Sequence, residues 1–206
     1  MPPTRRTQAE RSATTQAKLL DAALDCLVEH GYAGTTTTVV AERAGVSRGA
    51  QLHHFPTRAA LVAAAVDHLY ARLTSDYQRG FAALAPHAER LRAAIRLLWS
   101  MYTSPHFPAV IELFTAARSD EELRAHLGPI AARHQRNVYR LAREFFPDAA
   151  RLDRRFDATL ALILDAMQGM ASSDVQRGPV SVTARLEFLH DIAAAALAAA
   201  GTTEHA

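Results

Sequence analysis

Residues 35–58 have the sequence TTTTVVAERAGVSRGAQLHHFPTR, which predicts two short helices joined by a tight turn. Thr35 and Thr36 are both suited to cap the first helix, because a threonine hydroxyl can accept from an amide left free in the first turn. Gly45 suits a left-handed residue at the end of that helix, where a Cβ is penalised. Ser47 is placed to cap the second helix, which Pro56 ends. Two such helices are typical of helix-turn-helix proteins, whose second helix enters the DNA major groove.

The second helix has an unusual composition for a surface helix. Arg48 is followed by the small residues Gly49 and Ala50, and polar side chains follow at His53 and His54. Small residues beside an arginine suit a helix whose N-terminal end presses against base edges. The alternative interpretation is a solvated helical hairpin in an all-α protein, because helix-turn-helix patterns give false positives.

Several positions together resemble the N-terminal DNA-binding domain of the TetR (tetracycline repressor) family. The similarity runs without gaps over about residues 14–62, and beyond it only helix count and order are shared. The family implies a ligand-responsive transcriptional regulator, most often a repressor that binds a palindromic operator as a dimer. The matching residues are Gly31-Tyr32, the threonines, Ala41, Ala44-Gly45-Val46-Ser47, Gly49, His54-Phe55 and Leu61.

Two positions depart from the family pattern. Leu52 stands where the family usually has a phosphate-contacting tyrosine, and Gln51 stands where it has an apolar residue. Leu52 cannot donate to a phosphate, so that contact is expected to be absent. Gln51 either faces the DNA or is a partly buried polar group. Arg58 replaces a common lysine, which keeps the charge and adds a forked donor.

The pattern and the resemblance together define a set of expected DNA contacts. Arg48 is expected to bind a base edge, most simply guanine through two donors. Phosphate contacts are expected from Thr36, Thr37, Thr38, His54 and Arg58, with the alternative that His54 holds the turn internally. The candidate DNA-binding residues are Thr36, Thr37, Thr38, Ser47, Arg48, Gly49, Ala50, Gln51, His53, His54 and Arg58. In some relatives an N-terminal arm reaches the minor groove, so Arg5, Arg6 and Arg11 either do this or belong to an unstructured tail over residues 1–10.

Charge and cysteine content limit the class of protein. The 206 residues carry a net charge of +2, and residues 1–58 hold all of this excess, with seven Lys and Arg against five Asp and Glu. This excess favours local phosphate contacts over general polycation binding. A single cysteine, Cys26, excludes an intrachain disulfide framework and fits a reducing cytoplasm. No apolar run approaches the roughly 18 residues of a membrane span, and no signal peptide is recognisable.

The whole chain is predicted to be all-α, with about nine helices in two domains. Residues 1–57 are expected to hold an arm and the three-helix DNA-binding domain, and residues 58–206 an effector-binding and dimerisation domain. Gly31 should end the first helix, and Gly128-Pro129 should kink or interrupt the seventh. The expected helices cover about 12–30, two within 35–55, then 57–80, 86–103, one that starts near Pro105 and carries Val110 to Phe114, then 119–146, 151–173 and 181–200.

The second domain holds two further sets of candidate residues. Large apolar side chains with polar tips are suited to an effector pocket between helices, although the same residues also fill ordinary helical cores. These are Trp99, Tyr102, His106, Phe107, Phe114, Tyr139, Met167 and Met170. The last two helices carry apolar stripes, and in the resembled family this pair forms the homodimer interface; the alternative is intrachain core. The stripe residues are Phe156, Leu160, Ile163, Met167, Leu186, Leu189, Ala193 and Leu197.

Sequence motifs for catalysis and cofactor binding are not found. The chain has no Gly-rich phosphate loop, paired-cysteine motif or nucleophile elbow. Glu187 and His190 have the spacing used in carboxylate di-iron bundles, but the second copy that such a site needs is missing. No catalytic residue, metal or cofactor is therefore predicted. An all-helical enzyme and a helical interaction module that binds no DNA remain the alternative functions.

Overall fold

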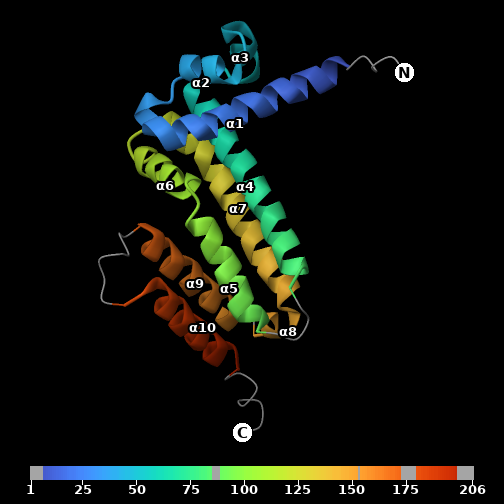
Figure 1. The fold of residues 1–206 in the computed structure, drawn as a ribbon, viewed down its shortest axis with the longest axis vertical. Helices are drawn as coiled ribbons and strands as arrows, with labels where there is room; N and C mark the ends of the chain where they lie inside the picture. The colour runs from blue at the N-terminus through green and yellow to red at the C-terminus, as the bar shows by residue number, and fades with distance from the viewer. Residues whose placement is uncertain (1–6, 85–88, 153, 173–179, 199–206) are drawn as a thin grey trace. The chain divides into compact units, whose positions relative to one another are not determined.

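A computed structural model describes residues 7–84, 89–152, 154–172 and 180–198, and the described residues form ten helices and no strand (Figure 1). The predicted all-α class is confirmed. The helix beyond the nine expected is the single turn α8, which begins at the proline that ends α7. The helices are α1 (Gln8–Gly34), α2 (Thr37–Ala44), α3 (Arg48–His54), α4 (Arg58–Ala82), α5 (Arg90–Tyr102), α6 (His106–Ala116), α7 (Glu121–Phe145), α8 (Pro147–Ala150), α9 (Arg154–Ser172) and α10 (Val182–Ala198).

Helix α1 begins four residues earlier than its apolar pattern predicts. Thr7 accepts a hydrogen bond from the Glu10 amide at 3.2 Å, and the Glu10 carboxylate accepts from the Thr7 amide at 2.7 Å. This reciprocal capping box satisfies two amide donors at the start of the helix. Arg11 therefore lies on α1 and not on an arm, whereas Arg5 and Arg6 lie outside the described residues.

The helical conformation of α1 is broken at Gly31, as expected, although three further residues follow in the same element. Gly31 has φ +64° and ψ −176°, a region that is essentially confined to glycine. A Cβ added there would lie 2.8 Å from a carboxylate oxygen of Glu112 on α6. The backbone conformation therefore favours glycine at this turn, and a Cβ would also require the Glu112 carboxylate to shift.

The residue after that turn, Tyr32, is held by three charged side chains. Its amide donates to Glu112 Oε1 at 2.7 Å, and its hydroxyl donates to Asp120 Oδ2 at 2.8 Å. The Arg58 guanidinium lies 4.0 Å from the centre of its ring. Burial and the hydrogen bond to Asp120 raise the pKa of the Tyr32 hydroxyl. The other Asp120 oxygen caps α7 through the Leu123 amide, and this bond is the main reason why the Asp120 pKa is lowered.

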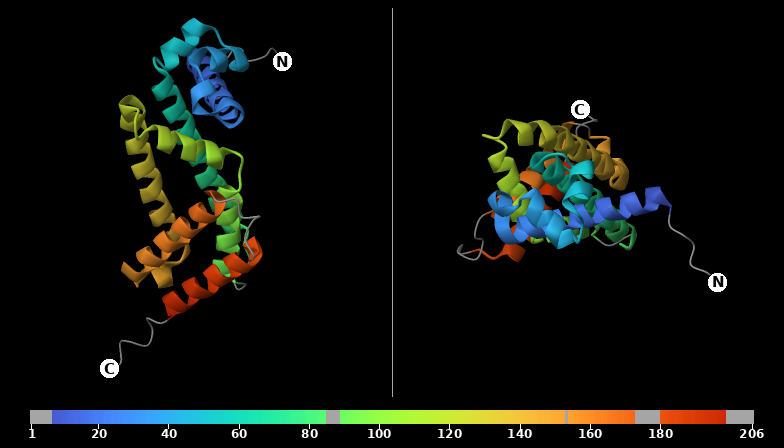
Figure 2. Two further views of the ribbon diagram at one scale, coloured as in Figure 1. Left: turned by 90° about the vertical axis from the view of Figure 1, so that its left-hand side faces the viewer. Right: turned by 90° about the horizontal axis from the view of Figure 1, so that it is seen from above.

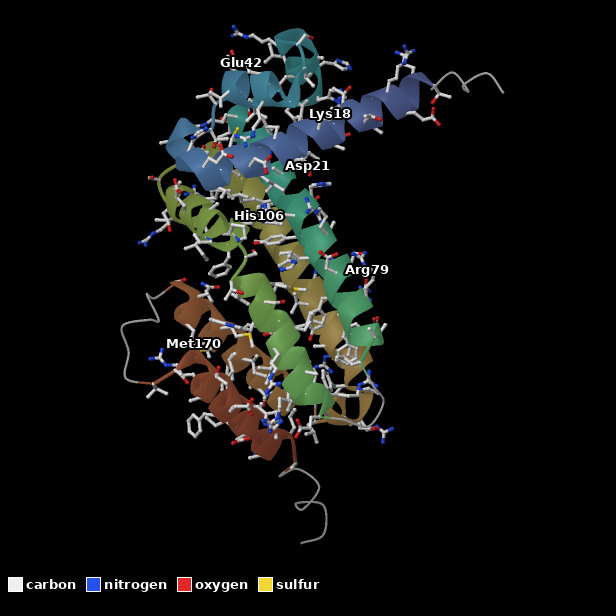
Figure 3. The ribbon with its side chains drawn as sticks, in the orientation of Figure 1. Lys18, Asp21, Glu42, Arg79, His106 and Met170 are labelled. Carbon is white, nitrogen blue, oxygen red and sulfur yellow. The ribbon has the colours of Figure 1, made fainter. Side chains whose placement is uncertain are left out.

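The described residues divide into two compact units, and α4 and α7 contribute to both. The first unit draws on Met1–Arg72 and Pro105–Ala132. Within it, α1 packs against α2 and α6, and α2 packs against α3. Its core is mostly apolar, with Thr35 and Gln51 as buried polar exceptions. On the α4 side of α1, Asp21 lies 3.2 Å from His68 and 3.3 Å from Arg72 (Figure 3). The fully buried core side chains include Leu19, Val40, Leu61, Val62, Val66, Leu113 and Leu123.

The second unit draws on Leu73–Ser104 and Arg133–Ala206, and in it α10 packs against α5 and α9. Aromatic rings join α4 to α7, with the ring centres of Phe81 and Phe145 4.1 Å apart. Burial raises the pKa of the neighbouring Tyr77 to about 12. An ion-pair cluster joins α5 to α10, where Glu187 accepts from Arg92 and from Arg96, the latter at 2.7 Å. The Glu187-x-x-His190 motif is thus engaged with arginines.

Two other expectations about helix ends had mixed outcomes. Helix α7 continues through Gly128 and Pro129, so of the two expected effects the interruption is wrong, and the kink stays a prediction. Asp120 caps the start of this helix, because its Oδ1 accepts from the Leu123 amide at 2.9 Å. Gly178 and Pro179, which fall between the last two expected helices, both lie outside the described residues, because 173–179 are not described.

The environment of Gly31 yields a stability prediction. We expect Gly31→Ala to lower the free energy of unfolding by about 1–3 kcal/mol, because alanine is strained in this backbone conformation and displaces the Glu112 carboxylate that accepts from the Tyr32 amide. Gly49→Ala is the matched control: its Cβ would meet nothing within 4 Å, and alanine favours the helix by up to about 1 kcal/mol. Urea denaturation at fixed protein concentration measures both variants. Equal stability of Gly31→Ala and the parent chain would contradict the analysis.

Candidate nucleic-acid interface

The turn between α2 and α3 is fixed by backbone hydrogen bonds and by two hydroxyl caps. Gly45 is left-handed, with φ +64° and ψ +36°, and the Val46 amide donates to the Ala41 carbonyl at 3.0 Å. This is a Schellman ending, which redirects the chain without leaving carbonyls unpaired. Thr36 caps α2 and Ser47 caps α3, with amide-to-hydroxyl distances of 3.2 and 3.3 Å. The predicted helix-turn-helix is therefore present, and within its unit α3 lies on the far side of α2 from α1 (Figure 2).

The inner side of α3 is anchored by Gln51. This side chain is fully buried, and its Nε2 donates to the Phe55 carbonyl at 2.7 Å. Its Oε1 is buried without a hydrogen-bond partner. The prediction that Gln51 contacts DNA is wrong, because the side chain points into the core beside Phe55, which is also buried. Gln51 takes the core position that the family pattern gives to an apolar residue.

The outer side of α3 is open to solvent. Ser47, Arg48, Gly49 and His53 are exposed and Ala50 is half-buried. A Cβ on Gly49 would meet nothing within 4 Å, so this side presents an arginine beside a flat strip of backbone. The exposed side also includes Leu52, 45% exposed, which the sequence marked only as a lost phosphate contact. A surface of this kind can approach base edges closely.

The predicted phosphate contacts flank this surface. Thr36 and Thr38 are exposed and Thr37 is half-buried. In a cap the Thr36 oxygen accepts a hydrogen bond, so its O–H is still able to donate to a phosphate. His54 is half-buried, with its ring centre 5.6 Å from that of His53.

The Arg58 side chain contacts Tyr32 within its own chain, which the sequence did not predict. Its guanidinium lies over the Tyr32 ring, and Nη1 donates weakly to the Tyr32 carbonyl at 3.5 Å. A guanidinium has five N–H donors, so this arrangement still leaves donors for a phosphate. The phosphate contact of Arg58 stays a prediction.

Helix α2 is tied to α1 by an arginine clamp. Arg43 donates to both carboxylate oxygens of Glu29, with Nη1–Oε2 at 2.6 Å, and its Nε lies 3.6 Å from Asp25. The pKa of Glu29 is lowered, chiefly by the hydrogen bonds from Arg43. One of the basic side chains of the N-terminal region is thus used to orient α2 and is not offered to DNA. Glu42 projects from α2 away from α1 (Figure 3).

The candidate effector residues fall into two groups. Trp99, Tyr102 and Met170 are partly buried and pack with the fully buried Met167 on the core of the second unit. Burial, with a contribution from nearby Asp165, raises the pKa of Tyr102 to about 12. Tyr139 belongs to the same unit, and burial raises its pKa as well. His106, Phe107 and Phe114 lie on α6 in the first unit.

The candidate dimer residues need a correction. Five of the eight are buried in the core of their own chain, namely Phe156, Ile163, Met167, Leu186 and Ala193. Leu160, Leu189 and Leu197 are half-buried. The apolar residues that α9 and α10 expose are instead Leu162, Phe188 and Ile192, at 64%, 66% and 49%. The sequence carried a signal for two of them, because Phe188 and Ile192 are spaced i,i+4 and share one face.

Metal-binding groups and membrane-spanning helices are both absent from the described part of the chain. No group of three or more His, Cys, Asp or Glu side chains is placed there to hold a metal ion. None of the described helices combines the length and apolar character that crossing a membrane requires.

An exposed arginine-bearing α3, set by a capped glycine turn and packed against α2, defines a helix-turn-helix DNA-binding protein. Comparison with known proteins agrees with this class. Residues 19–65 match the family model described as "Bacterial regulatory proteins, tetR family". CymR, an HTH-type transcriptional regulator of Pseudomonas putida, is 41% identical over 124 residues, which are 60% of this chain and 61% of CymR. The HTH-type transcriptional regulator Rv2912c of Mycobacterium tuberculosis is 30% identical over 171 residues, 81% of this chain and 85% of that protein.

Solved structures share the fold at lower sequence identity. A putative transcriptional regulator from Pseudomonas aeruginosa PAO1 has a TM-score of 0.67 at 19% identity, covering 98% of this chain and 95% of its own. The multidrug binding protein EbrR, solved with proflavin, has a TM-score of 0.60 at 21% identity, covering 88% and 99%. With the longer sequence match, these findings show that the chain belongs to the tetR family of DNA-binding transcriptional regulators.

The burial of Gln51 separates its role from that of Arg48. We expect Gln51→Met to leave DNA sequence preference unchanged, because residue 51 faces the core, and methionine fills the same length without a buried unpaired oxygen. The DNA sequence preference of the parent chain and of Gln51→Met is measured by selecting bound duplexes from a random pool with each protein. A changed base at any position of the selected site would show that residue 51 takes part in recognition.

Proposed function

We propose that this chain is a transcriptional repressor that binds a palindromic operator as a homodimer and is released from it by a small molecule. Residues 1–57 would form the DNA-binding domain, and residues 58–206 would bind the effector and the second subunit. The named relatives are transcriptional regulators, which supports a role other than catalysis. A regulator of this kind acts in the cytoplasm, where its DNA is.

The observation that carries the proposal is the division of α3 into two sides. Gln51 and Phe55 are buried, while Arg48, Gly49 and His53 are exposed. An α-helix with an arginine and small residues at its N-terminal end fits the major groove, where a guanine offers two acceptors to one guanidinium. Ser47 and the threonines of α2 would hold the helix in place on the phosphates.

This arrangement predicts different effects for base and phosphate contacts. Arg48→Ala should cost about 1–3 kcal/mol of binding free energy and relax preference at one base position per half-site. Thr37→Ala, the control, should weaken binding to all sequences alike. Titration of full-length protein onto a selected duplex and its single-base variants, at stated salt, measures both. Retained base preference in Arg48→Ala would refute the assignment.

Dimerisation is proposed to use the exposed face of α9 and α10. Leu162, Phe188 and Ile192 are large apolar side chains with about half to two thirds of their surface in water, and exposed alanines at 158, 184 and 195 allow close helix approach. Two-fold symmetry would place each of these side chains against the same face of the second copy. A homodimer of this kind supplies two copies of α3 for the two halves of a palindrome.

The interface proposal predicts the effect of a charge on that face. Phe188→Glu should shift the protein from dimer to monomer, because burying a phenylalanine contributes about 1.5–3 kcal/mol and the change occurs on both subunits. Sedimentation velocity over a concentration series measures the shift. Val28→Glu alters a comparably exposed apolar residue, at 40%, on α1 and should remain dimeric. A dimer that survives Phe188→Glu would place the interface elsewhere.

The effector site is proposed for the aromatic and sulfur side chains of the second unit. Trp99, Tyr102 and Met170 combine apolar bodies with polarisable or hydrogen-bonding groups, which suits a partly aromatic small molecule. A fold neighbour, EbrR, was solved with proflavin. Repression would then be a difference in DNA affinity between two conformations, and the effector would favour the weaker one.

A further inference from the structure

An isolated apolar side chain lies on the DNA-facing side of α3. Six large hydrophobic residues are exposed among the described residues; four of them lie on or next to α9 and α10, and Val28 lies on α1. The sixth is Leu52, with 45% of its surface in water. The core of the first unit does not explain it, because Gln51 and Phe55 already supply the buried side of α3. Leu52 therefore presents its methyl groups to whatever α3 binds.

The neighbours of Leu52 restrict what that partner can be. Leu52 is one helical turn beyond Arg48, and residues four apart lie on the same face. Gly49, three residues before it, carries no side chain and has open space around its Cβ position. Leu52 is thus flanked by an exposed cation on one side and bare backbone on the other. Such a surface can press against a groove edge but offers no hydrogen bond from position 52.

Only one group in the major groove is matched to an aliphatic side chain. The four base pairs differ there in their donors and acceptors, and thymine alone adds an exposed C5-methyl group. Resting on the proposed operator binding, we propose that Leu52 is a specificity-determining residue that contacts the C5-methyl group of a thymine in each half-site. It gives the protein an apolar contact with the bases in place of a hydrogen bond to the phosphate backbone.

The helix geometry also says where this thymine lies. Four residues advance about 6 Å along α3, and neighbouring bases on one strand are about 3.4 Å apart. A thymine contacted by Leu52 therefore lies one or two base pairs from the base that Arg48 contacts. Arg48 and Leu52 would specify a guanine and a thymine in close succession.

Replacing thymine by uracil in the DNA tests the contact, because the exchange removes only the methyl group. A duplex is first selected from a random pool by the full-length protein, and each thymine is then replaced by uracil in turn. We expect one symmetry-related position to weaken binding by roughly fourfold per half-site, the equivalent of one buried methyl group. Leu52→Ala should bind the thymine duplex more weakly and be insensitive to the replacement at that position. Val28→Ala, the control, should respond as the parent chain does.

The outcomes separate the contact from the function on which it rests. The Leu52 contact would be overturned if uracil replacement lowered the DNA affinity of the parent chain and of Leu52→Ala equally, or if it lowered affinity at no thymine. Operator binding would stand in either case. Selection of no duplex at all would overturn operator binding and the contact together. Leu52→Tyr adds a third comparison: a gain in affinity for all sequences, with loss of sensitivity to uracil, is the result expected when a phosphate donor replaces the methyl contact.

Discussion

The structure depends on the contacts that hold α3, a helix too short to be stable alone, while they leave one of its sides exposed. Helix α3 has seven residues, and isolated helices shorter than roughly 12–15 residues are marginal in water. Three constraints fix it: the left-handed Gly45, the Ser47 cap, and the burial of Gln51 with Phe55. All three act on the inner side or on the ends of the helix. The outer side is therefore free to carry residues chosen for DNA and not for folding.

Polar contacts from the surrounding helices hold the helix-turn-helix in place. Arg43 joins α2 to α1 through Glu29, and Tyr32 joins α1 to α6, α7 and α4 through Glu112, Asp120 and Arg58. Gly31 permits the turn that brings the Tyr32 amide to the Glu112 carboxylate. These polar contacts lie at the edges of an apolar core, where partial exposure keeps the cost of burying charge low. They give the DNA-binding helices a defined orientation within their unit.

Sequence patterns predicted the parts of this fold that depend on local chemistry. The caps at Thr36 and Ser47 and the glycine turn at Gly45 are short-range features, and all appear where predicted. The start of α1 was missed although Thr7 and Glu10 carry a capping-box signal, because the prediction followed the apolar pattern and ignored the polar first turn.

Features that depend on packing were harder to predict. Gln51 is polar and lies among DNA-facing residues, so only the rotation of α3 about its axis shows that it is buried. Helices α9 and α10 are apolar on more than one face, and periodicity cannot say which face meets the chain's own core and which meets a second copy. The Tyr32 contacts join residues 80 and 88 positions apart, which no local pattern contains.

The central claim is that α3 enters the major groove, and methylation of the DNA tests it most directly. Dimethyl sulfate methylates guanine at N7, an acceptor that lies in the major groove. The account predicts that methylation of a guanine in each half of the selected duplex excludes that duplex from the complex formed by the full-length protein. Complexes that tolerate N7 methylation at every guanine, in duplexes whose half-sites contain guanine, would contradict it.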